Sequence, residues 1–324
     1  MKSIVTIGGG TGQFTLLTGL KKYPVKLTAV VSMADDGGST GVLRDELGVL
    51  PPGDVRQCLV AISEAETIVR DLFNYRFDAG GLKGHNFGNI FLSALEKITG
   101  NFDEAVRVAG MVLATRGTVI PVTTQDARLV SGHGDLCING QYAIETAELP
   151  KDPDLHLEPD VYANPKAIEA IDEADCIVIG PGNYYCSILP NLLVKGVAEA
   201  IGRAKGKVVY NCNLMTKKGH TDGFTVDDFA AGIERFIGKG RIDFVTCNSV
   251  TPDQELLDRY AAEGEFPVPK MVSGEKDGRT YLAADLMSRT MPTQKAGDPI
   301  KRTLIRHDPA VLASLIVTNC LGGL

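Results

Sequence analysis

Residues 1–12 are Met1-Lys2-Ser3-Ile4-Val5-Thr6-Ile7-Gly8-Gly9-Gly10-Thr11-Gly12. The run at 4–7 is apolar or β-branched and uncharged, which is typical of a strand buried on both faces of a parallel sheet. After the glycines, Phe14, Leu17 and Leu20 recur at helical spacing. A strand, a glycine turn and a helix together present bare backbone N–H groups and a helix N-terminus to a phosphate. We therefore predict that residues 8–12 form a phosphate-binding or nucleotide-binding turn.

This turn departs from the two best-known phosphate-binding motifs. The dinucleotide fingerprint G-x-G-x-x-G requires a glycine where Gln13 stands, and a P-loop requires a lysine directly after Gly12. The alternative is that the glycines only permit a tight turn. The stretch leaves the identity of the nucleotide open.

Composition bounds the class of protein. The chain has 324 residues, of which 44% are hydrophobic and 23% charged, as in globular proteins with a sizeable core. Its formal net charge of −7 argues against a general affinity for nucleic acid. Its seven cysteines form no C-x-x-C pair, and no apolar run approaches the roughly 18 residues that a membrane span needs. With a strand starting at residue 3, we expect no signal peptide, no membrane span and a cytoplasmic protein.

A second polar loop follows the strand predicted over 25–31. It contains Asp35 and Asp36, and the ends of adjacent parallel strands meet at one ligand crevice. A carboxylate there could bind a ribose hydroxyl or a metal ion held by phosphates. The alternative is an Asx-turn with the glycines that follow.

The remaining pattern predicts a Rossmann-like α/β fold. Three apolar-striped helices over 66–76, 87–98 and 102–113 indicate a helical insertion at about residues 41–115, and Asp54 is expected to cap a helix that runs to Ser63. Residues 127–147 suggest a hairpin that includes 141–144. A buried strand over 176–179 leads into a second glycine turn, Gly180-Pro181-Gly182-Asn183. We predict one domain over 1–324, with a doubly wound, mostly parallel sheet.

Several motifs, met in order along the chain, are shared with a known family. They are Gly8-Gly9-Gly10-Thr11-Gly12, Ala34-Asp35-Asp36-Gly37-Gly38-Ser39-Thr40-Gly41-x-Leu43-Arg44, Leu50-Pro51-Pro52-Gly53-Asp54-x-Arg56, Gly84-His85-Asn86-x-Gly88-Asn89, Ile179-Gly180-Pro181-Gly182-Asn183-x-Tyr185-x-Ser187-Ile188-x-Pro190-Asn191-Leu192, Cys212-Asn213-x-Met215-Thr216 and Arg306-His307-Asp308. Together they closely resemble the YvcK group of the CofD-like superfamily, the gluconeogenesis factors. One departure is His220, which stands where the family usually has a carboxylate.

The resemblance implies a cytoplasmic protein that binds UDP-sugars, typically UDP-N-acetylglucosamine, and acts in cell shape and wall-precursor supply during gluconeogenic growth. We also expect a regulatory protein partner and a homo-oligomer, in the form of a dimer. Carried over residue by residue, the implied ligand contacts are Gly9, Gly10, Thr11 and Gly12 for the diphosphate, Asp36 for a sugar or ribose hydroxyl, and Asn183, Tyr185, Ser187, Asn213, Thr216, Tyr260 and Arg306 around it. Tyr260 is expected to stack on the base, and Arg306 to pair with a phosphate.

Three functions compete. The favoured one is a UDP-sugar-binding regulator without catalysis, which requires no cofactor. The second is a transferase like the sister group, the 2-phospho-L-lactate transferases, in which Asp35 or Asp36 holds Mg²⁺ on a nucleotide diphosphate. The third is an NAD(P) dehydrogenase, against which the misplaced third glycine weighs. Whether the chain is an enzyme is left open by the sequence.

Overall fold

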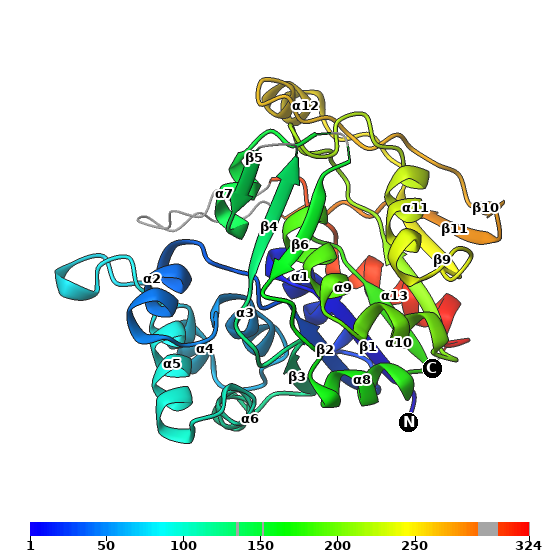
Figure 1. Cartoon of the computed structure of the whole chain (residues 1–324). Coiled ribbons are helices and arrows are strands. Elements are labelled where there is room, and N and C mark those ends of the chain that lie inside the picture. Colours follow the sequence, from blue (N-terminus) through cyan, green and yellow to red (C-terminus); the bar gives the residue numbers. More distant parts are fainter. Residues whose placement is uncertain (134–135, 151, 291–303, 324) are drawn as a thin grey trace.

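The computed structural model describes residues 1–133, 136–150, 152–290 and 304–323. Its centre is an eight-stranded sheet in the order β10-β11-β9-β8-β7-β1-β2-β3, which lies between layers of helices (Figure 1). Only β10 runs antiparallel to its neighbour, and the other adjacent pairs are parallel. The strands are β1 (Ser3–Gly8), β2 (Lys26–Val31), β3 (Thr118–Pro121), β7 (Cys176–Ile179), β8 (Lys207–Asn211), β9 (Phe244–Asn248), β10 (Gly274–Lys276) and β11 (Arg279–Ala284). The predicted Rossmann-like fold class is confirmed.

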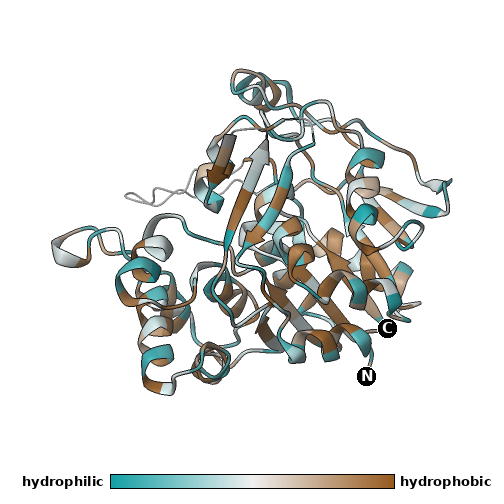
Figure 2. Cartoon of the chain, viewed as in Figure 1, coloured by the Kyte–Doolittle hydropathy of each residue, from teal (hydrophilic) through white to brown (hydrophobic). Residues whose placement is uncertain are grey.

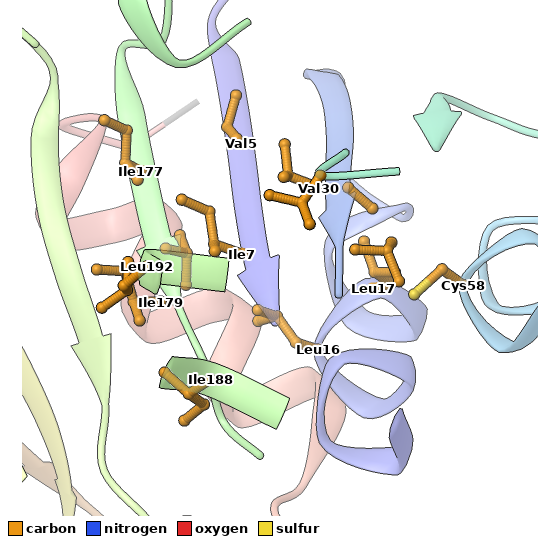
Figure 3. Close-up of a cluster of buried hydrophobic side chains, with 14 of the residues drawn as sticks. Val5, Ile7, Leu16, Leu17, Val30, Cys58, Ile177, Ile179, Ile188 and Leu192 are labelled. Atoms are coloured by element: carbon orange, nitrogen blue, oxygen red, sulfur yellow. The ribbon is translucent and has the colours of Figure 1, made fainter. Parts of the chain in front are cut away.

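Strand β1 lies inside the sheet, between β2 and β7. Ile4 pairs with Leu27 on one side and with Cys176 on the other, and all three side chains are buried. Figure 3 shows Ile7 of β1 in one cluster with Ile179 of β7 and with the first helix. In Figure 2, hydrophobic residues concentrate in these central strands. A strand covered on both faces requires this continuous apolar run.

Helices cover both faces of the sheet. Helix α1 (Gly10–Leu20) packs against α13 (Pro309–Cys320) so closely that a Cβ atom on Gly19 would lie 1.9 Å from the carbonyl oxygen of Pro309. Phe14, expected on the buried stripe with Leu17 and Leu20, is 36% exposed, whereas both leucines are fully buried. Between β6 and β10 in the chain lie the helices α8 (Pro165–Asp172), α9 (Leu189–Leu193), α10 (Val197–Arg203), α11 (Val226–Ile237) and α12 (Gln254–Ala261).

The predicted helical insertion lies between β2 and β3. It comprises α2 (Gly38–Leu47), α3 (Gly53–Ala61), α4 (Thr67–Asn74), α5 (Phe87–Thr99) and α6 (Phe102–Val112). The three helices expected over 66–113 are therefore confirmed as α4, α5 and α6. One detail is wrong: Asp54 does not cap α3, because Pro52 occupies the N-cap position and Asp54 lies in the first turn. This frees the Asp54 carboxylate for a contact outside its own helix.

A small antiparallel sheet, β5-β4-β6, follows the insertion, with β4 (Arg128–His133), β5 (Leu136–Asn139) and β6 (Asp154–Glu158). The hairpin predicted over 127–147 is correct for β4 and β5 only, because Gln141–Thr146 forms helix α7. The cause is a distant residue. The Asp36 carboxylate accepts hydrogen bonds from the backbone N–H groups of Gln141 (3.0 Å) and Tyr142 (2.8 Å), which stabilises the start of the helix.

Across the described ranges, no helix is both long and apolar enough to cross a membrane. Cys176, Cys212 and Cys247, which lie in or directly after β7, β8 and β9, are buried.

Candidate functional site

The first glycine turn joins β1 to α1 at the carboxyl edge of the sheet. Gly9 occupies the N-cap position of α1 and has no side chain to accept the free N–H groups of the first helical turn. Gly10 follows with φ of +63°, a conformation that side chains disfavour. Thr11 is exposed. The N–H of Gly10 donates to the Asp54 carboxylate, and the other backbone donors of the turn are available to an anion approaching the N-terminus of an 11-residue helix.

The second glycine turn contacts the first one directly. A Cβ atom on Gly12 would lie 2.2 Å from the carbonyl oxygen of Pro181, and one on Gly182 would lie 3.6 Å from the carbonyl oxygen of Gly9. The contact arises because β1 and β7 are parallel neighbours, with Ile7 paired to Ile179. Both strands therefore end at the same edge of the sheet, where the two turns begin. The two turns thus form one continuous backbone surface.

Two carboxylates lie behind the first turn. A Cβ atom on Gly9 would lie 2.2 Å from Asp54 Oδ2, and the Asp54 carboxylate accepts a hydrogen bond from the N–H of Gly10. Asp35 accepts from the N–H of Gly37 at 3.0 Å, and its Oδ2 would lie 2.3 Å from a Cβ atom on Gly53. Burial raises the pKa of both groups; that of Asp54 rises to about 8, with the Asp35 charge as the second cause. A cation or a proton beside this pair would relieve its repulsion.

Helix α7 brings a third carboxylate, Glu145, to the same edge. Its oxygens lie 3.2 Å from Asn183 Nδ2 and 3.6 Å from Lys217 Nζ. The charge of Glu145 contributes to the raised pKa values of Asp35 and Asp54. No local motif marks Glu145, and the hairpin predicted over 127–147 places its segment in a strand, so the residue was not predicted from the sequence.

Asp36 is engaged elsewhere. Besides capping α7, it lies 3.7 Å from the guanidinium of Arg128. Its side chain therefore fixes the small sheet and α7 over the glycine turns. Of the two aspartates predicted as metal ligands, the structure places Asp35 beside Asp54 and uses the oxygens of Asp36 for backbone N–H groups.

Among the residues predicted on the second turn, Asn183 caps the short helix 184–188 by accepting from the N–H of Cys186 at 3.2 Å. The hydroxyl oxygen of half-buried Ser187 would lie 3.8 Å from a Cβ atom on Gly10, so this side chain borders the first turn. Asn213 donates to the carbonyl of Gly182 at 2.9 Å, and its Oδ1 finds no partner in the described part of the chain. These three polar side chains surround the joined turns.

Tyr185 and His220 form a buried aromatic pair, with ring centroids 5.8 Å apart. The Tyr185 hydroxyl and His220 Nδ1 are buried, and neither finds a hydrogen-bond partner within the described ranges. His220 Nε2 lies 3.0 Å from the carbonyl oxygen of Ile144. Burial, followed by the charge of Lys217, lowers the pKa of His220, which favours the neutral imidazole. The histidine thus packs α7 against the second turn.

Two further residues predicted to contact the ligand, Thr216 and Tyr260, are hydrogen-bonded to the protein's own backbone. Thr216 is buried, and its hydroxyl exchanges hydrogen bonds with the backbone of Phe266 at 3.0 and 3.1 Å. Tyr260 is 8% exposed, and its hydroxyl accepts from the N–H groups of Leu304 (2.9 Å) and Ile305 (3.1 Å). Tyr260 therefore holds the chain directly before half-buried Arg306. The structure does not bring Thr216 or Tyr260 to the glycine turns as free side chains.

The described residues contain no group of three or more His, Cys, Asp or Glu side chains placed to hold a metal ion. Asp35 and Asp54 nevertheless fit Mg²⁺ chemistry. This ion commonly keeps several waters and binds through one or two carboxylates together with ligand phosphates. The phosphate side of such an arrangement would be the first glycine turn.

Comparison with known proteins identifies the family of this chain. Residues 4–287 match the family described as 2-phospho-L-lactate transferase CofD. The gluconeogenesis factor of Bacillus subtilis is 39% identical over 97% of this chain and 96% of its own, and that of Listeria innocua is 42% identical over 88% of each. A crystal structure described as a UPF0052 family member from Bacillus halodurans superposes with a TM-score of 0.87 and 36% identity over 97% of this chain and 98% of that one. The chain belongs to the CofD family and, within it, to the group of gluconeogenesis factors.

Proposed function

We propose that this protein is a cytoplasmic UDP-sugar-binding regulator, with UDP-N-acetylglucosamine as its ligand. The observation that carries the proposal is the junction of the two glycine turns, where the N-terminus of α1 meets Asn183, Ser187 and Asn213. The names of the relatives support a role in gluconeogenic growth, and we propose cell shape and wall-precursor supply as the output. A protein partner and a homodimer complete the proposal.

The ligand's diphosphate would bind the backbone N–H groups of residues 9–12, because helix N-termini favour anions. Asn183, Ser187 and Asn213 would contact the sugar or ribose. The unpartnered Asn213 Oδ1 is suited to accept from a hydroxyl group. Arg306 would contribute charge from the C-terminal segment.

A second function, a Mg²⁺-dependent transferase, is favoured by the Asp35–Asp54 pair. When bound there, Mg²⁺ would neutralise charge on a nucleotide diphosphate. The chain's own part would be to hold that diphosphate on the glycine turn. Burial, followed by the charge of Asp35, raises the pKa of Asp54 to about 8, and a bound cation would favour the ionised form of this carboxyl.

Calorimetric titration with UDP-N-acetylglucosamine, GDP and NAD, each with and without Mg²⁺, separates these functions. Binding of the UDP-sugar without metal, with the ligand recovered intact after incubation, is the expected result. A preference for GDP with an obligatory metal would support the transferase. Binding of NAD alone would contradict both.

Replacing Tyr260 with phenylalanine tests how that residue acts. We expect a roughly tenfold loss of affinity for UDP-N-acetylglucosamine, because the variant cannot accept the hydrogen bonds from Leu304 and Ile305 that position Arg306. A residue that only stacks on the base would tolerate phenylalanine, so unchanged affinity would contradict this role. Tyr75→Phe, at a 49% exposed site on the insertion, is the matched control.

Replacing Glu145 with glutamine is expected to raise the affinity for the UDP-sugar several-fold in the absence of Mg²⁺. The substitution removes a negative charge that a diphosphate would face, and the amide oxygen still accepts from Asn183. Calorimetry at low and high salt measures the effect, which should shrink as screening increases. A loss of affinity would instead show that the Lys217 contact dominates. Glu46→Gln, on the exposed part of α2, controls for net charge.

A further inference from the structure

A cavity of about 360 Å³ lies in the helical insertion, away from the glycine turns. It is bounded by the C-terminal end of α2, the end of α5, the start of α6 and the loop before β4. These elements are labelled in Figure 1. No residue of either glycine turn lines it. Its polar lining side chains are Arg44, Glu96, Asn101, Thr124 and Asp126.

Arg44 is the buried donor of this cavity, with only 4% of its surface exposed. Its Nη2 donates to Asp126 Oδ1 at 2.5 Å and to the carbonyl oxygen of Ala127 at 2.7 Å. Its Nε and Nη1 are buried and find no acceptor among the residues that the structure describes. Buried N–H groups are nearly always paired in folded proteins, so this guanidinium lacks acceptors that a buried arginine usually has.

The charges of the lining side chains indicate which kind of ligand the cavity would accept. Glu96 lines the cavity and accepts from the backbone N–H of Leu50 at 3.0 Å, and Asp126 already neutralises the guanidinium. Two carboxylates against one guanidinium give the cavity a net charge of about −1, which repels anions. A lining of charged and amide side chains equally disfavours an apolar molecule, because these groups would lose their hydrogen bonds to water.

We propose that this cavity is a second binding site, for a neutral, hydroxyl-rich small molecule of monosaccharide size. Hydroxyl groups of such a ligand would donate to Glu96 and Asp126 and accept from Arg44. The volume lies at the lower end of small-molecule pockets, which run from about 300 to 1,000 Å³. The site is independent of the proposed UDP-sugar site, since the two share no residue.

Saturation-transfer NMR on the full chain tests the proposal. The probes are D-glucose, D-mannose, N-acetylglucosamine and myo-inositol as neutral ligands, and gluconate as an anion of similar size. Each is measured with and without UDP-N-acetylglucosamine. We expect at least one neutral probe to bind whether or not the nucleotide sugar is present, and at least tenfold more tightly than gluconate. Absence of transfer to every neutral probe, or a preference for gluconate, would overturn the proposal.

Two variants locate the binding. Glu96→Gln keeps an acceptor for Leu50 and removes the charge, so it should shift the ratio of neutral-probe to gluconate affinity about tenfold toward gluconate. Arg44→Lys should abolish binding of the neutral probe, and a thermal melt reports whether that variant folds. Asp71→Asn, at an exposed site on α4, should leave binding unchanged. A neutral probe that binds Glu96→Gln with the wild-type preference over gluconate does not use this cavity.

Discussion

Replacing Gly12 with alanine is expected to lower the free energy of unfolding by about 3 kcal/mol, the upper part of the range for overpacked sites. The new methyl group would lie 2.2 Å from the carbonyl oxygen of Pro181 and 3.0 Å from the Cα atom of Gly182. Both are backbone atoms, so relief requires the two turns to separate. Urea unfolding followed by circular dichroism measures the loss, and the separation should also reduce UDP-sugar binding.

The control for this prediction is Gly81→Ala. Nothing lies within 4 Å of a Cβ atom at Gly81, and its φ lies outside the left-handed range. We expect this variant to keep the wild-type stability within about 0.5 kcal/mol, as surface substitutions usually do. Equal stability of the two variants would show that the turns are not packed as described.

Replacing Asp54 with asparagine is expected to increase the free energy of unfolding at pH 8 by about 3 kcal/mol, from the difference between its folded and unfolded pKa values discounted for partial exposure. The pKa of Asp54 rises from 3.8 to about 8, with burial as the largest cause and Asp35 as the second. Between these values the folded chain binds more protons than the unfolded chain. Wild-type stability therefore falls as the pH rises through this window, and the loss is complete only above pH 8.

Denaturant unfolding at pH 4, 6 and 8 checks this sign. The variant and the wild type should agree at pH 4 and diverge as the pH rises, whereas Asp71→Asn should follow the wild type throughout. An Asp54→Asn protein less stable than wild type at pH 8 would contradict the prediction. Adding Mg²⁺ offers a second comparison, because an ion bound by Asp35 and Asp54 would restore the wild-type stability and leave the variant unchanged.

The sequence predicted well those elements whose pattern is local. Runs of apolar residues predict the buried strands β1, β2, β7 and β9, and helical periodicity predicts the helices of the insertion. Clusters of glycine between these elements predict both glycine turns. The edge strand β10 and its neighbour β11 did not stand out, since β10 is fully exposed and lacks an apolar pattern.

The composition of the site was less predictable, because distant contacts decide it. Helix α7 depends on an N-terminal cap from Asp36, 105 residues earlier in the chain, and only with α7 in place does Glu145 reach Asn183. Asp54 seemed suited to capping its own helix, yet its carboxylate lies against Gly9 and Gly10. The Tyr260 hydroxyl is likewise used by Leu304 and Ile305. None of these contacts can be recognised from the spacing of residues along the sequence.

The position of β1 also has a consequence for biogenesis. Strand β1 is synthesised shortly before β2 and can pair with it at once, but its other edge waits for β7, whose pairing begins at Cys176. Until about half of the chain has been synthesised, that edge offers unpaired backbone groups to other polypeptides. Because Gly12 needs Pro181 beside it, the phosphate turn is completed in the same step. A stalled nascent chain of 150 residues should therefore bind chaperones and not the ligand, whereas one carrying residues 1–324 beyond the exit tunnel should do the reverse.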